Sequence, residues 1–287
     1  MAVSRKKSVG ILVNHDVRKP YVVKPPSALP DITGRLDRYD IGTAAWSRKT
    51  GMTVPRAGFV MESAGEFLYA IGGTNGAAVL KSVEEYDTFT DTWETRTDMP
   101  TPRCYMQSVV HDSFIYCIGG LTANGIGTTS ISRQVERYDA IHDTWAQMEP
   151  MPADKGIMMG TANLVGDKIY IIGGYEKEYF KYSTSVYVYD ISDDSWTELP
   201  IIDDDEAIAA SRLLHFSFVV GSTIYFTNGV YYSPSPPVND DEEEIPPVMT
   251  YLSDAWKYNT LTDSFSKADR DFENLPETRY GGTTATQ

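Results

Sequence analysis

The chain has 287 residues, enough for one large domain or two small ones. Its 40 Asp and Glu against 25 Lys and Arg give a net charge of −15, which argues against a protein that binds nucleic acid through a basic surface. No apolar run approaches the roughly 18 residues of a membrane-spanning helix, and no secretory signal is visible, so we expect a cytoplasmic protein without a membrane partner. Cys104 and Cys117 are too few for a disulfide framework or a thiolate-rich zinc site.

The chain opens with a basic extension, residues 1–34, followed by a repetitive domain over residues 35–287. The first 56 residues hold 11 Lys and Arg against 4 Asp and Glu, so the acidity belongs to the rest of the chain. Within the extension, the apolar run from Val9 to Asn14 can supply one strand.

One motif is written five times from residue 39 onward: Tyr, then Asp or Asn, then five residues, then an aromatic. The interval from Tyr to the second aromatic is seven residues in every copy, whereas successive copies lie 47, 52, 51 and 69 residues apart. A fixed unit with connections of variable length indicates a structural repeat. The aromatic pairs are Tyr39 and Trp46, Tyr86 and Trp93, Tyr138 and Trp145, Tyr189 and Trp196, and Tyr258 and Phe265.

Each of the last four copies follows an apolar run that ends in a glycine pair. The pairs are Gly72-Gly73, Gly119-Gly120 and Gly173-Gly174, and the fourth unit has Asn228-Gly229, in which Asn tolerates a positive φ. A second apolar stretch lies upstream of each run, across a short polar turn. We therefore expect units of four strands, named a to d, over residues 56–99, 103–151, 155–199 and 212–275. Strands c and d recur alone at 35–47, and 279–287 resembles a lone strand a.

A four-stranded antiparallel sheet cannot bury both of its faces alone, and blades packed radially solve this problem. The sequence therefore predicts an all-β propeller of four-stranded antiparallel blades. We count five blades, with six as the alternative, in a ring closed by N-terminal and C-terminal strands.

The combination of Gly-Gly, Tyr-Asp and Trp, followed by Met-Pro and a basic residue, resembles the kelch repeat. The similarity covers residues 35 to about 285 and is strongest over 56–99. It implies a monomeric kelch-type propeller similar to that of the BTB-kelch adaptors, which act as substrate receptors of ubiquitin ligases. This sequence departs from those adaptors in having no BTB or BACK region.

One face of such a propeller collects the residues that open strands a and c. The first set is basic and the second is polar, so we expect a cationic channel mouth that binds an acidic or polar peptide segment. The alternative is that each cation pairs locally with a carboxylate. The predicted binding residues are Arg56, Arg103, Lys155, Arg212, Arg279, Ser82, Gln134 and Ser185.

The same face is expected to carry two acidic segments, at 203–206 and within a Pro-rich loop at 231–250. Such runs are usually solvated loops. We expect the run Asp240, Asp241, Glu242, Glu243 and Glu244 to fold over the cationic mouth and compete with an acidic partner.

Catalytic motifs are weak. The four histidines do not form a copper site of the galactose-oxidase kind, because His111 and His142 fall in turns and His215 is a lone strand residue. The Glu-x3-Asp-x3-His iron motif of plant specifier kelch proteins is absent. We therefore predict a non-catalytic adaptor with no cofactor or metal. The alternatives are a cytoskeletal, actin-associated scaffold and a sugar-directed enzyme such as a sialic-acid isomerase.

Overall fold

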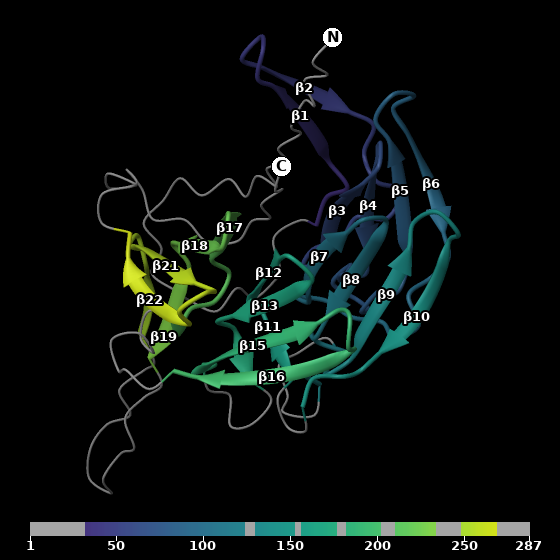
Figure 1. Cartoon of the computed structure of the whole chain (residues 1–287). Coiled ribbons are helices and arrows are strands. Elements are labelled where there is room, and N and C mark those ends of the chain that lie inside the picture. Colours follow the sequence, from purple (N-terminus) through teal and green to yellow (C-terminus); the bar gives the residue numbers. More distant parts are fainter. Residues whose placement is uncertain are drawn as a thin grey trace, which may run out of the picture.

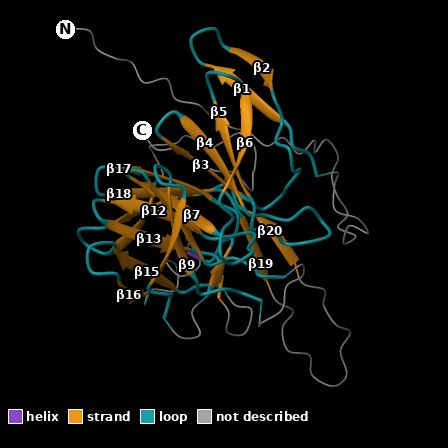
Figure 2. Ribbon diagram, turned by 90° about the vertical axis from the view of Figure 1, so that its right-hand side faces the viewer, coloured by secondary structure: helices purple, strands orange, loops and turns teal. Residues whose placement is uncertain are grey.

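The computed structural model describes residues 32–123, 130–152, 156–176, 182–201, 210–233 and 248–268. Within these ranges nearly all regular structure is β-strand, as Figure 2 shows. The predicted strands at 9–14 and 279–287 lie outside the described residues, as does the acidic run at 240–244. The closure of the ring and the count of five blades therefore stay predictions.

The four predicted units each form a four-stranded antiparallel sheet, which confirms the propeller. Blade I consists of β3 (Val60–Ala64), β4 (Phe67–Ile71), β5 (Val83–Asp87) and β6 (Thr92–Arg96). Blade II consists of β7 (Gln107–His111), β8 (Phe114–Ile118), β9 (Val135–Asp139) and β10 (Thr144–Met148). Blade III consists of β12 (Thr161–Val165), β13 (Lys168–Ile172), β15 (Ser185–Asp190) and β16 (Ser195–Pro200). Blade IV consists of β17 (Phe216–Val220), β18 (Thr223–Thr227), β21 (Ala255–Asn259) and β22 (Ser264–Lys267).

The blades follow one another around an arc, in chain order (Figure 1). Contacts between the innermost strands set this order, because β7 touches both β3 and β12, and β12 touches β17. The N-terminal copy of strands c and d forms a separate ribbon of β1 (Leu36–Asp40) and β2 (Ala45–Lys49). Two small sheets lie at the b-to-c connections. In one, β11 (Ile157–Met158), which precedes strand a of blade III, pairs with β14 (Tyr175–Glu176) of the b-to-c connection, and in the other β19 (Val230–Ser233) pairs with β20 (Val248–Tyr251).

The glycine pairs join each blade to the next. Gly119 has a φ of +65°, and a Cβ atom there would lie 2.1 Å from the carbonyl oxygen of Ile157. The next residue, Gly120, donates its N–H to that carbonyl over 2.8 Å. Side chains cannot occupy this contact, so the motif needs glycine for the approach of a neighbouring backbone. Asn228 takes the first position in blade IV with a φ of +60°, as predicted.

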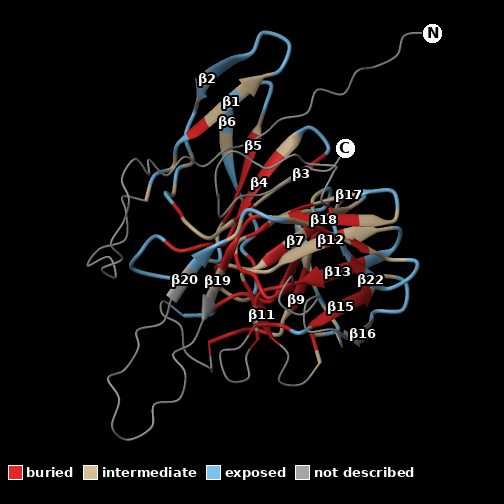
Figure 3. Ribbon diagram, turned by 90° about the vertical axis from the view of Figure 1, so that its left-hand side faces the viewer, coloured by how far each residue is buried: buried red, intermediate tan, exposed pale blue. Residues whose placement is uncertain are grey.

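Apolar side chains form clusters between neighbouring blades, on strands that Figure 3 colours largely as buried. One cluster joins Tyr69 and Ile71 of blade I to Ile115, Cys117 and Tyr138 of blade II. Cys117 is buried and free, as is Cys104, which confirms that the two thiols do not pair. Burial raises the pKa of the Cys117 thiol to about 12, so its role is packing.

The seven-residue aromatic interval has a direct structural meaning. Tyr138 and Trp145 lie opposite each other on β9 and β10, with ring centroids 5.0 Å apart. The hydroxyl of Tyr138 donates to Asp143 over 2.6 Å, and Asp143 also accepts the backbone N–H of Thr97, at the end of blade I, over 2.8 Å. The indole of Trp145 donates to the carbonyl of that same Thr97. In blades I, II and III, Tyr, Asp and Trp therefore fasten the outer edge of the blade to the chain that leaves the preceding blade or, for blade I, the N-terminal ribbon.

Candidate functional site

The propeller has two faces with different chemistry. We call "loop face" the ends of the blades where strands a begin and b-to-c connections run. We call "turn face" the opposite ends, formed by the a-to-b and c-to-d turns. The two turns of one blade touch: the hydroxyl of Thr88 donates to the carbonyl of Glu66 in blade I, and the backbone N–H of Ala140 donates to the carbonyl of Ser113 in blade II.

The three predicted arginines that the structure describes open strand a at equivalent places, yet all three are buried inside their blades. Arg56, Arg103 and Arg212 expose 2%, 0% and 1% of their surface. The guanidinium of Arg103 donates to the carbonyls of Gly119 and Gln134 over 2.8 and 2.9 Å, and to Glu136 over 2.8 Å. Blades I, II and IV thus each enclose an arginine that bonds the end of strand b and the start of strand c.

Arg56 and Arg212 repeat this arrangement. Arg56 donates to the carbonyls of Gly72 and Ser82 and to the carboxylate of Glu84 over 2.6 Å. Burial would raise the pKa of Glu84, but hydrogen bonds from Thr53 and Arg56 outweigh it and lower the pKa. Arg212 donates to the carbonyl of Asn228 and to Asp254.

These three arginines therefore do not present a cationic surface, and this part of the predicted binding site is corrected. Local pairing, the alternative that the sequence left open, is what the structure shows. The physical reason is that the carbonyls of the b-to-c connection and a nearby carboxylate need donors inside the blade.

The polar residues of the predicted site are also engaged within the blades. The hydroxyl of Ser82 accepts a hydrogen bond from Arg56, Gln134 pairs with Gln147, and Ser185 donates to Glu198 over 2.8 Å. Ser82 and Gln134 stay partly exposed, whereas Ser185 is buried. Lys155 and Arg279 lie outside the described residues.

The turn face carries a feature that the sequence reading missed. Three c-to-d turns expose a large apolar side chain at the same position: Phe89 by 95%, Ile141 by 73% and Leu261 by 80%. Each follows an Asp or Asn by two residues, and its backbone N–H donates to that side chain, as Ile141 does to Asp139. The turn thereby holds the apolar side chain outward. The available signal was the repeat itself, which sets Phe, Ile and Leu at one position of a polar turn.

Exposed carboxylates lie on the same face. The a-to-b turns contribute the exposed side chains of Glu66, Asp112 and Asp167. Between blades I and II the turn face is hollowed by a cavity of about 570 Å³, which is lined by residues that include Phe67, Ile141, Glu66, Asp112 and Asp143. The turn face thus combines apolar side chains, negative charge and a groove.

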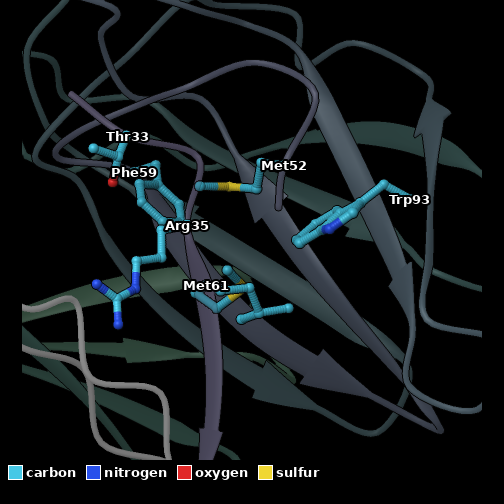
Figure 4. Close-up of a pocket in the computed structure, with 7 residues that line it drawn as sticks. Thr33, Arg35, Met52, Phe59, Met61 and Trp93 are labelled. Carbon is cyan, nitrogen blue, oxygen red and sulfur yellow. The ribbon is translucent and has the colours of Figure 1, made fainter. Parts of the chain in front are cut away.

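A second cavity, shown in Figure 4, lies between the N-terminal ribbon and blade I. Met52, Phe59, Met61 and Trp93 line it together with Arg35. Its volume of about 10 Å³ holds at most a single water molecule, so it is no ligand site.

Two titratable groups lie between neighbouring blades. Glu62 on β3 accepts a hydrogen bond from Ser108 on β7 over 2.6 Å, and burial raises its pKa to about 7. His215, beside β17, lies 2.9 Å from the Thr161 hydroxyl on β12, and burial together with Arg212 lowers its pKa to about 3. His215 is thus a core residue.

Further observations concern metals and membranes. Among the residues that the structure describes, no group of three or more His, Cys, Asp or Glu could hold a metal ion. None of the helical structure in the described part of the chain has the length and hydropathy of a membrane span.

Together, the repeated blades, the glycine pairs that join them and the hydrogen bonds of Tyr, Asp and Trp at their outer edges define a β-propeller of kelch-type repeats. The family model described as the Attractin/LZTR1 beta-propeller matches residues 28–233, more than half of the chain. The chain therefore belongs to this family, and membership indicates a protein-interaction module.

The chain also resembles individual proteins. The Kelch-like protein terF of Aspergillus terreus (strain NIH 2624 / FGSC A1156) is 30% identical over 139 residues, which cover 47% of this chain and 28% of that protein. The chain thus matches less than a third of the length of this relative. The structure of YjhT has a TM-score of 0.69 at 16% identity, over 89% of this chain and 85% of that one, a likeness of fold alone.

Proposed function

We propose that this propeller is a non-catalytic recognition module of the adaptor type, which binds a partner protein through its turn face. The observation that carries the proposal is the exposure of Phe89, Ile141 and Leu261 at one equivalent position. Apolar side chains scattered singly are normal on a protein surface, whereas these three recur at one position of the repeat, which favours a surface that a partner covers.

The fold itself does not require these apolar side chains. Blade III has Ser192 at the same position, and the backbone N–H of Ser192 donates to Asp190 as in the other turns. Because the turn forms equally well with serine, the apolar residues are available for another purpose.

The partner is thus expected to bind the turn face instead of the loop face. A cationic mouth that binds acidic peptides would lose Arg56, Arg103 and Arg212 to the interior of the blades. An acidic peptide is also a poor ligand for a turn face that bears Glu66, Asp112 and Asp167, because like charges repel.

Affinity capture with two matched variants tests this function. The turn-face variant combines Phe89→Ser, Ile141→Ser and Leu261→Ser, and the loop-face variant combines Ser82→Ala and Gln134→Ala. We expect the wild-type chain and the loop-face variant to retain the same dominant protein, and the turn-face variant to lose it while unfolding at the wild-type denaturant midpoint. Loss of the protein with the loop-face variant alone would refute the turn-face assignment.

A further inference from the structure

We propose that the groove between blades I and II on the turn face binds a basic amphipathic segment of a partner protein, one that alternates Lys or Arg with large apolar residues. This inference rests on the proposed function and specifies where on the turn face the partner lies and what its chemistry is.

The groove is formed by turns from both blades. Gly65 and Glu66 of the β3–β4 turn and Asp112 and Ser113 of the β7–β8 turn line it, and Tyr69 contributes from β4. Its volume of about 570 Å³ is within the range of sites that hold a ligand of several side chains.

Apolar side chains border the groove on two sides. Ile141 lines it from the c-to-d turn of blade II and is 73% exposed. In blade I, Thr88 bonds the carbonyl of Glu66, which places the turn bearing the fully projecting Phe89 next to the groove. A segment in the groove can therefore bury apolar side chains against both blades.

The charge of the groove selects a basic segment. Glu66, Glu85, Asp112 and Asp143 line it with a single cation, Arg96. That guanidinium is already paired with Glu85 over 2.5 Å and with Glu94 over 3.3 Å. Carboxylates so placed attract Lys and Arg and repel an acidic peptide.

Asp143 adds to the negative charge because it stays ionised. Burial would raise the pKa of Asp143, but hydrogen bonds from Tyr138 and Thr97 outweigh it and lower the pKa. Asp143 consequently contributes a negative charge to the groove at neutral pH.

The test uses the full chain and a fluorescent peptide of fourteen alternating Lys and Leu residues, with a Glu-Leu peptide of the same length as the probe control. Each groove variant has a counterpart of the same chemistry away from the turn face. Ile141→Ser is matched by Tyr251→Ser at the end of β20, and Glu66→Lys is matched by Glu149→Lys, whose exposed side chain lies just after β10.

We expect the Lys-Leu peptide to bind more tightly than the Glu-Leu peptide, and its binding to weaken as the salt concentration rises. Loss of the buried apolar area at Ile141 should raise the Kd about tenfold. The charge reversal Glu66→Lys should raise the Kd by a similar factor, and both counterparts should leave it within about twofold of the wild-type value.

Two results would overturn the inference. Equal weakening by each groove variant and its counterpart would show that binding is not confined to the groove, which removes the groove and leaves the proposed function to its own capture test. No preference for the Lys-Leu peptide would remove the basic segment as the ligand. The proposed function itself fails only if the turn-face triple variant still captures the partner.

Discussion

The buried arginines allow a sharp test of their structural role, with Arg103→Met as the perturbation. The guanidinium makes four hydrogen bonds within blade II, to three backbone carbonyls and to Glu136. Methionine keeps part of the side-chain volume but removes all four. Glu136, which is fully buried, then keeps the hydroxyl of Thr101 as a donor and loses its counter-charge.

The magnitude follows from this geometry. Breaking a buried ion pair by removing one partner costs about 3–5 kcal/mol, because it leaves an uncompensated charge in the interior. We therefore expect Arg103→Met to lower the free energy of unfolding by about 4 kcal/mol, a large share of the 5–15 kcal/mol typical of a domain. Adding Glu136→Gln to Arg103→Met should restore about 2 kcal/mol, because it removes the unpaired charge.

The assay is urea unfolding of the full chain, followed by tryptophan fluorescence, with Arg133→Met as the matched control. Arg133 lies in the same blade and is half-buried, and its side chain donates to the carbonyl of Met151. The control should lose about 1 kcal/mol. If Arg103→Met lost no more than Arg133→Met and yet abolished partner capture, Arg103 would be a binding residue and the structural reasoning would be refuted.

Three further predictions test the connections between blades. Gly119→Ala should lower the free energy of unfolding by at least about 2 kcal/mol in the same assay, because its Cβ would meet a backbone carbonyl in the chain entering blade III. The control Gly65→Ala, at the same φ but in open space, should lower it by about 1 kcal/mol. Trp145→Phe should cost about 1 kcal/mol through the lost indole hydrogen bond to blade I, and an unchanged midpoint would contradict the fastening. Glu62 and His215 should give opposite pH dependences. The pKa of Glu62 is raised from 4.5 to about 7, so its protonated form favours the folded state and stability falls as pH rises through 7. The pKa of His215 is lowered from 6.5 to about 3, so stability falls as pH drops below about 6.5. Glu62→Gln should therefore leave stability falling from pH 6.5 toward 4.5, His215→Gln should leave it rising over that range, and parallel slopes would contradict both assignments.

The propeller could be predicted from the sequence because its signals are local and repeated. A seven-residue interval between Tyr and Trp is the interval of two residues that face each other across a hairpin, as Tyr86 and Trp93 do. The glycine pair marks a positive φ and a close backbone approach, and the repeat multiplies each signal. The fourth unit could also be predicted, although its motif is degenerate. Asn228 preserves the backbone conformation of the motif, and Phe265 preserves its packing.

The site was harder to predict because a repeat places a side chain on a face without saying whether it points outward or inward. A charged residue at the start of strand a can point to solvent, but Arg103 turns into the blade, where the carbonyl of Gly119 and the carboxylate of Glu136 await a donor. The sequence indicates this inward orientation of the arginine only through an acidic residue two positions before the Tyr of strand c, which is Glu84 in blade I and Glu136 in blade II.

The apolar residues of the turn face show the converse. Phe89 and Ile141 belong to a turn whose conformation the sequence explains through its Asp and Thr side chains. The sequence therefore assigns no role to the apolar side chains themselves. The structure separates the two roles: the backbone N–H groups of Phe89 and Ile141 serve the turn, while their side chains make no contribution to it and project into solvent. A residue that contributes to the fold only through its backbone leaves its side chain available for recognition. In a repeat protein such positions are found by comparing equivalent turns. Ser192 forms the same turn in blade III without any apolar surface.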